Sequence, residues 1–168
     1  MNKYKRIYIV GHSGAGKGVL AQALANKLGW KFIDTDFGLA PSIGRSLKDI
    51  LGTQGEASFH QCLTDILSSQ KTMENIVVTT DDSILASPKN KELLSSEYVV
   101  WLQVSPDVQL ERIGHNRPLL PRSDYKEFLN TLRLERDDLY NQVANFSLIS
   151  DNGEIDSHVE QIINAMKK

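Results

Sequence analysis

A chain of 168 residues, 40% of them hydrophobic and 24% charged, has the size and composition of one soluble globular domain. Its formal net charge of −2 excludes a general attraction to nucleic acid or to anionic membranes. No apolar run approaches the roughly 18 residues that a membrane span needs, and the lone cysteine, Cys62, cannot form an internal disulfide and is expected to serve in packing. We therefore expect a cytoplasmic, monomeric protein that acts on a small-molecule substrate, with neither nucleic-acid nor membrane partners.

Short apolar runs alternate with helical spacing along the whole chain, a pattern typical of α/β proteins. Strands are predicted at residues 6–10, 31–34, 76–80, 98–104 and 146–149. Helices are predicted at residues 19–28, 46–51, 56–67, 89–94, 108–112, 125–143 and 155–166. Buried strands separated by helices indicate a three-layer α/β/α fold, a single domain over residues 1–168 with a five-stranded parallel sheet.

Four predicted strands end at or just before Gly11, Asp34, Asp81 and Ser105. Parallel strands bring their carboxyl ends to one edge of the sheet, and ligands bind beyond that edge. The sequence therefore predicts that one edge carries most of the polar chemistry.

Residues 11–18 (Gly-His-Ser-Gly-Ala-Gly-Lys-Gly) match the phosphate-loop pattern G-x-x-x-x-G-K between a predicted strand and a predicted helix. The glycines let the backbone turn tightly and point its N–H groups inward, and Lys17 adds a positive charge for the β- and γ-phosphates. A plain glycine-rich turn is the alternative, but the flanking strand and helix favour ATP binding. The predicted nucleotide contacts are Gly11, Ser13, Gly14, Ala15, Gly16, Lys17, Gly18 and Val19.

Gly18 departs from the usual phosphate loop, which has Ser or Thr at this position to coordinate Mg²⁺ through the hydroxyl. Glycine offers no ligand, so the metal must rely on water and on carboxylates elsewhere in the chain. We expect nucleotide affinity to survive this change better than catalytic rate, because the metal supports charge in the transition state.

Several further segments, taken in order, resemble the shikimate kinases over most of the chain. The matching segments are Asp34-Thr35-Asp36, Gly44-Arg45-Ser46-Leu47-Lys48-Asp49-Ile50, Gly55-Glu56 with Phe59, Arg117-Pro118-Leu119-Leu120, and Arg136-Asp137-Asp138-Leu139-Tyr140. The resemblance implies a substrate-binding helical segment at about 36–67 and a lid at about 113–124. It also implies transfer of the ATP γ-phosphoryl group, with Mg²⁺, to a hydroxyl of a small carboxylated ring.

The resemblance also assigns catalytic roles to four residues. Lys17 and Arg117 would hold the transferring phosphoryl group, and Asp36 would bind the substrate hydroxyls and act as a base. Asp34 would position Mg²⁺ through water. Phosphoryl transfer needs positioning and charge neutralisation above all, which these residue types supply. Two alternatives stay open: Asp34 and Asp36 could cap the next element, and Arg117 could be a solvated loop residue.

Two more arginines have binding roles by the same resemblance. Arg112 would lie against the adenine ring, and Arg136 would pair with the substrate carboxylate. Because Arg136 lies in the charged run 135–138, a surface ion pair is the alternative for it. The sequence does not indicate a binding role for either His12 or His158. We expect His12 to point to solvent or to the acceptor side, and His158 to lie on the surface.

The acceptor site departs from the family pattern at three places. His60 replaces an arginine that clamps the substrate carboxylate, Leu63 replaces a glutamate, and Asp81-Asp82-Ser83 replaces a glycine triplet. An unperturbed imidazole is mostly neutral at pH 7, and added carboxylates repel an anion. With His60 and Asp82 as substrate contacts, the site is expected to prefer a neutral or cationic acceptor to shikimate.

Asp81 is also a candidate metal ligand, since strand-end acids often hold Mg²⁺ in phosphate-loop proteins. A turn or a helix N-cap is the alternative for this residue. The leading hypothesis for the whole chain is ATP-dependent phosphoryl transfer to a hydroxyl of a small metabolite. Because of Gly18 and the altered acceptor site, a non-catalytic nucleotide-binding regulator is the second hypothesis, followed by another class of phosphate-loop protein.

Overall fold

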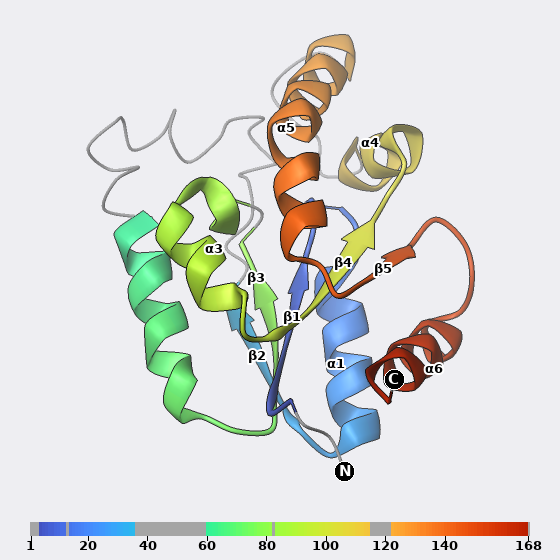
Figure 1. The fold of residues 1–168 in the computed structure, drawn as a ribbon. Coiled ribbons are helices and arrows are strands. Elements are labelled where there is room, and N and C mark those ends of the chain that lie inside the picture. The colour runs from blue at the N-terminus through green and yellow to red at the C-terminus, as the bar shows by residue number, and fades with distance from the viewer. Residues whose placement is uncertain (1–3, 13, 36–59, 82, 115–121, 168) are drawn as a thin grey trace.

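The computed structural model describes residues 4–12, 14–35, 60–81, 83–114 and 122–167. Within them, five parallel strands form one sheet in the order β2-β3-β1-β4-β5 (Figure 1). These strands are β1 (Arg6–Val10), β2 (Lys31–Thr35), β3 (Ile76–Thr80), β4 (Tyr98–Gln103) and β5 (Phe146–Ile149). All five lie where the sequence predicts them, with ends that agree to within one residue.

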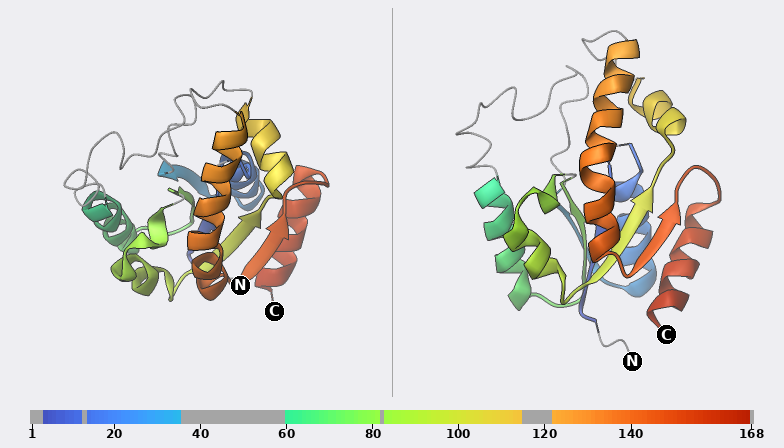
Figure 2. Two further views of the ribbon diagram at one scale, coloured as in Figure 1. Left: turned by 90° about the horizontal axis from the view of Figure 1, so that it is seen from above. Right: turned by 45° about the horizontal axis from the view of Figure 1, so that its top comes forward.

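Helices cover both faces of the sheet, so the predicted three-layer α/β/α fold is confirmed (Figure 2). The helices are α1 (Lys17–Leu28), α3 (Pro88–Leu94), α4 (Pro106–Gly114), α5 (Arg122–Val143), α6 (Ile155–Met166) and one that covers residues 60–69. Short 3-10 turns at Gln70–Thr72 and Ile84–Ala86 are additions that the sequence did not indicate. The predicted helix at 46–51, the first part of that at 56–67, and most of the predicted lid lie outside the described residues.

The buried core has two halves, one on each face of the sheet. In β1, Ile7 and Ile9 face the half covered by α1 and α6, whereas Tyr8 and Val10 face the half beneath α3, α5 and residues 60–69. This alternation explains why the strand reads as a continuous apolar run: both of its faces are buried. The central strand therefore packs apolar side chains into both halves of the core.

Cys62 is exposed, so the expectation that it packs in the core is wrong. It lies in the helix at 60–69, whose buried side is formed instead by Leu63 and Leu67. Neighbouring residues on a helix point in directions about 100° apart. Cys62, which directly precedes Leu63, therefore lies on the solvent side. In the described parts of the chain, no helix has the length and apolar character required to cross a membrane.

A buried carboxylate organises the amino end of the sheet, opposite the edge with the phosphate loop. Glu97 is 3% exposed, and its Oε2 accepts hydrogen bonds from Arg6 Nε at 2.8 Å and Lys71 Nζ at 2.7 Å. Burial and the nearby Glu97 charge raise the pKa of Tyr8, whose hydroxyl donates to Gln70 Oε1 at 2.9 Å. This network joins β1, the 70–73 turn and the start of β4.

We predict that Glu97→Leu destabilises the protein by roughly 3 kcal/mol, because it leaves the Arg6 and Lys71 cations without their buried partner. The matched control is Glu74→Leu, which removes a 3.0 Å ion pair with Lys5 in which both side chains are more than half exposed. That change is expected to cost less than about 1 kcal/mol. Urea unfolding measures both, and equal losses would contradict this account of the amino end.

Candidate active site

The turn after β1 brings the backbone unusually close to β4. Gly11 is buried with φ +149°, and a Cβ atom at this position would lie 2.4 Å from the carbonyl oxygen of Leu102. Gly14 (φ +88°) and Gly16 (φ +92°) adopt the left-handed conformation that glycine tolerates without strain. The described part of this loop is thus the tight glycine turn that the sequence predicts, and it leads directly into α1.

Lys17, the first residue of α1, folds back over this turn. Its side chain is only 3% exposed, and Nζ donates to the carbonyl oxygens of Gly11 at 2.8 Å and His12 at 3.1 Å. The positive charge is therefore held next to the loop amides and the amino end of a helix. That combination is an anion site by backbone dipole and by charge.

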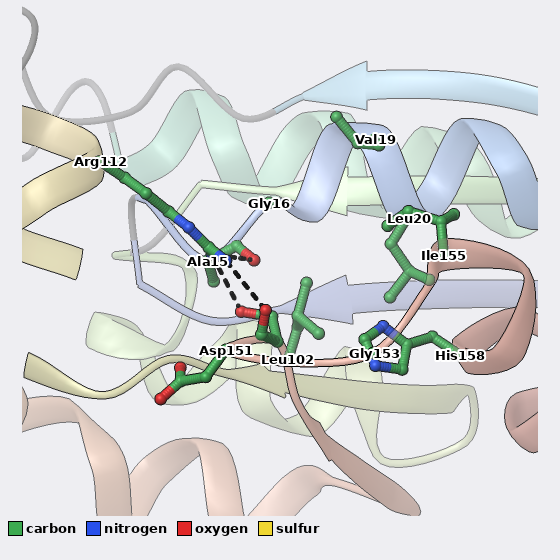
Figure 3. Close-up of a pocket in the computed structure, with 11 residues that line it drawn as sticks. Ala15, Gly16, Val19, Leu20, Leu102, Arg112, Asp151, Gly153, Ile155 and His158 are labelled. Atoms are coloured by element: carbon green, nitrogen blue, oxygen red, sulfur yellow. Dashed lines mark hydrogen bonds between the residues drawn. The ribbon is translucent and has the colours of Figure 1, made fainter. Parts of the chain in front are cut away.

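A cavity of about 350 Å³ adjoins the loop on the side of β4 and α6 (Figure 3). It brings together residues from the loop and α1, from α4, and from the segment between β5 and α6. Those that line it are Ala15, Gly16, Val19, Leu20, Leu102, Arg112, Ser150, Asp151, Gly153, Ile155 and His158. Its mostly apolar walls and its position beside the phosphate loop suit the base of a nucleotide.

Arg112 ties this cavity to the loop. Its guanidinium donates to the carbonyl oxygen of Gly14 at 3.0 Å. It also donates to the carbonyl oxygen of Ala15 at 3.3 Å (Figure 3). It also donates to the hydroxyl of Ser150 at 3.1 Å and to the Ser150 carbonyl at 2.9 Å. The residue expected to lie against adenine therefore forms part of the cavity wall and joins the loop to the β5–α6 connection.

Two residues of this cavity were missed or misjudged from the sequence. His158 is 6% exposed and lines the cavity, so the expectation of a surface position is wrong. The reason is that Gly153 packs on its ring, where an added Cβ would lie 2.8 Å from Nε2. A usable signal existed, because position 158 shares the helical face of Ile155 and Ile162. Asp151, the second residue, lines the cavity and was not among the predicted site residues.

A second cavity, of about 250 Å³, lies on the other side of the sheet. It unites His60, which begins the helix at 60–69, with Arg136 from the middle of α5. The full lining is His60, Ser83, Leu85, Ala86, Glu135, Arg136, Leu139 and Tyr140. Arg136 is half buried in this wall and does not stand on the open surface. A cation and an imidazole from distant segments therefore line one cavity.

His12 links the two sides. Its side chain is almost fully buried, with Nε2 2.6 Å from Asp137 Oδ1 and its ring edge-on to Tyr140 at a centroid distance of 5.1 Å. Of the two orientations that the sequence allows, the ring takes the one toward the acceptor side.

The two predicted metal acids stand near neighbouring strand ends. Asp34 Oδ1 accepts a hydrogen bond from Thr79 Oγ1 at 2.7 Å across the β2–β3 pair. Asp81 is 2% exposed, and its Oδ2 accepts from the backbone N–H of Ser83 at 3.1 Å and from its hydroxyl at 2.5 Å. Asp81 thus makes the turn that was its alternative role. The described residues contain no group of three or more His, Cys, Asp or Glu arranged to hold a metal.

Four predicted site residues lie outside the described ranges: Ser13, Asp36, Asp82 and Arg117. The structure brings most of the other predicted residues to the carboxyl edge of the sheet in two groups, whereas Asp34 and Asp81 line neither cavity. One group surrounds the phosphate loop and the 350 Å³ cavity, and the other lines the 250 Å³ cavity. An enzyme that transfers a group between two substrates must hold both of them next to each other, and two cavities at one sheet edge suit this.

Asp151 supplies a pH-dependent prediction. A hydrogen bond from the Ser105 backbone (2.9 Å), then the charges of Arg112 and Arg133, lower the pKa of this carboxyl below its usual 3.8. The stabilisation is thus complete above that value and is lost as the pH falls through the lower folded pKa. In unfolding measurements, Asp151→Asn should be less stable than wild type by under about 1 kcal/mol at pH 7, with the gap closing in acid. A gap that does not change with pH would contradict this.

Comparisons with family models, curated proteins and solved structures each find shikimate kinases. A family model described as shikimate kinase matches residues 13–167. The shikimate kinase of Xanthomonas euvesicatoria pv. vesicatoria (strain 85-10) is 35% identical over 154 residues, covering 90% of this chain and 86% of that protein. That of Halorhodospira halophila (strain DSM 244 / SL1) is 35% identical over 165 residues, covering 96% and 93%. The structure of shikimate kinase from Acinetobacter baumannii in complex with shikimate superposes with a TM-score of 0.81 at 27% identity, covering 99% and 94%.

Proposed function

Because this chain belongs to the shikimate kinase family, we propose that it transfers the γ-phosphoryl group of ATP to a hydroxyl of shikimate. Members of this family are phosphotransferases with an alcohol acceptor, and this chain is such an enzyme. The observation that carries the proposal is the pair of cavities at one sheet edge, with the phosphate loop between them. One cavity suits a nucleotide base, and the other contains an arginine suited to a carboxylate.

On the donor side, the loop amides and Lys17 bind the phosphate oxygens. The ammonium already lies over the loop at hydrogen-bond distance from two of its carbonyl oxygens. It can therefore meet a β- or γ-phosphate with little rearrangement, and it neutralises charge that develops during transfer. We assign the nucleotide base to the cavity beside Arg112. Arg117 is the second cation, after Lys17, that we assign to the phosphates.

Mg²⁺ is the metal that such a transfer uses, and the chemistry of the donor set fits it partly. Asp34 and Asp81 offer hard carboxylate oxygens near the carboxyl edge, whereas Gly18 offers none. Asp34 would hold such an ion through water, with phosphate oxygens and further water as its other ligands. When bound, the ion would neutralise phosphate charge.

On the acceptor side, Arg136 is the partner for a substrate carboxylate. Arginine pairs with a carboxylate through two parallel hydrogen bonds, and half-burial strengthens such a pair. His60, in the same wall, donates or accepts one hydrogen bond in place of the family's second arginine. We assign the binding of the reacting hydroxyl, and removal of its proton, to Asp36.

A neutral polyhydroxylated acceptor is the second candidate. Glu135 lines the same cavity as Arg136, so the wall carries both signs of charge. Together with His60 in place of an arginine, this weakens the preference for an anion that the family relatives imply. Comparison of a charged acceptor with an uncharged one of the same shape decides between the two.

We predict that the enzyme phosphorylates shikimate with a kcat/KM at least about tenfold above that for shikimate methyl ester, since only the acid pairs with Arg136. Arg136→Gln should raise the KM for shikimate by about 10- to 100-fold and leave the KM for the ester and for ATP nearly unchanged. A coupled ADP-release assay measures all three. An ester that matches or exceeds the acid would favour the neutral acceptor, and transfer to neither would refute the proposed function.

Gly18 offers a gain-of-function test of the metal argument. A Cβ at this position would meet no atom within 4 Å, so a serine side chain has room. We expect Gly18→Ser to raise the Mg²⁺-dependent kcat by about tenfold, because the hydroxyl supplies a metal ligand. Gly18→Ala is the matched control: it adds the same Cβ without a hydroxyl, and because alanine favours a helix more than serine does, helix stabilisation alone would not favour the serine variant. Equal rates for the two variants would show that the missing hydroxyl does not limit this enzyme.

A further inference from the structure

We propose that His12 and Asp137 form a positioning pair that holds the phosphate loop in register with the acceptor-binding helix α5. The acceptor part of this inference rests on the proposed function, whereas the mechanical link between loop and helix does not. Neither residue has a role in the nucleotide or acceptor contacts described above.

The His12 end of the pair is built into the phosphate loop. Its carbonyl oxygen accepts hydrogen bonds from Ala15 N at 3.2 Å and from Lys17 Nζ at 3.1 Å. Its side chain, 3% exposed, extends from the loop toward α5. Any change in loop conformation that accompanies phosphate binding must therefore move this imidazole or be resisted by it.

The Asp137 end lies one residue from Arg136, which lines the 250 Å³ acceptor cavity. Its carboxylate is 2.6 Å from the buried imidazole, a short distance typical of a strong hydrogen bond. Tyr140, on the next turn of α5, packs edge-on against His12 and lines the same cavity. One polar and one aromatic contact thus connect the loop to the helix face that carries the acceptor residues.

Hydrogen bonds from a second residue of α5 hold this helix in place near the pair. Arg133, four residues before Asp137, donates to Val104 O and Gln109 Oε1, both at 2.7 Å, and so fixes α5 to the β4–α4 connection. With the helix held at this point, the His12–Asp137 contact sets how the turn with Arg136 lies relative to the loop. The distance between the phosphoryl group and the acceptor hydroxyl depends on this placement.

The test compares His12→Phe, Asp137→Ala and the double variant. Phenylalanine keeps a ring for the contact with Tyr140 and removes the polar atom. Asp138→Ala is the matched control, since it removes an exposed carboxylate from the next position of the same helix. Asp137→Asn is the conservative variant, because its amide oxygen still accepts a hydrogen bond from the imidazole. Circular dichroism and thermal unfolding identify which variants fold, and Asp137→Ala set against Asp137→Asn carries the comparison should His12→Phe not fold.

The first readout needs no acceptor. In wild type, ADP should slow amide hydrogen exchange in residues 133–140 at least about threefold, because a loop closed on phosphate steadies α5 through the pair. Asp138→Ala and Asp137→Asn should retain this protection, and His12→Phe and Asp137→Ala should lose it. Protection that persists in both of the last two variants, or is absent in wild type that binds ADP, overturns the proposal whatever the acceptor is.

The second readout is kinetic. Each single change should lower kcat and raise the acceptor KM, with a combined loss of about tenfold in kcat/KM and little change in the ATP KM. The double variant should be no worse than the poorer single variant, since both changes remove one interaction. Additive losses would mean that the two residues act independently, and losses as large in Asp138→Ala would mean that the effect is not specific to the pair; either result overturns the proposal.

Discussion

The close approach of Gly11 to the carbonyl of Leu102 is the constraint on which the rest of the site depends. An added Cβ would lie 2.4 Å from that oxygen, so only glycine lets the backbone turn this tightly beside β4. The turn directs the chain into α1 and places the ammonium of Lys17 over the loop carbonyls. β1 lies between β3 and β4 in the centre of the sheet. The turn after it lies between the cavity assigned to the nucleotide base on one side of the sheet and the acceptor cavity on the other.

The donor and acceptor sides of this enzyme have diverged to different degrees. On the proposed donor side, Arg112 joins the loop to the cavity wall, and Gly18 lacks the hydroxyl normally found at its position. On the acceptor side, Arg136 remains but faces His60 and Glu135. Leu63, at the position of the family's glutamate, is 2% exposed and belongs to the core on that face. Its side chain therefore contributes apolar packing to the core on that face.

The sheet, its helices and the phosphate loop could be predicted because each depends on local patterns: apolar runs such as β4, the glycines at 11, 14 and 16, and the cap at Gly29 (φ +70°). Residues whose role depends on contacts between distant segments were not predictable in this way. His12, for example, meets Asp137 from 125 positions away. Asp81 was ambiguous because a turn and a metal site both use an acid after a strand, and its bonds to Ser83 could not be read from spacing.

Calorimetric titration with ATP is the most direct measurement of the central claim that the loop after β1 binds a polyphosphate. The account predicts one saturable site per chain in the wild type. It also predicts a loss of affinity of at least about tenfold in Lys17→Met, in which the charge over the loop is removed and the side-chain length is kept. Saturable binding that is equally tight in Lys17→Met, or no binding in the wild type, would contradict the account.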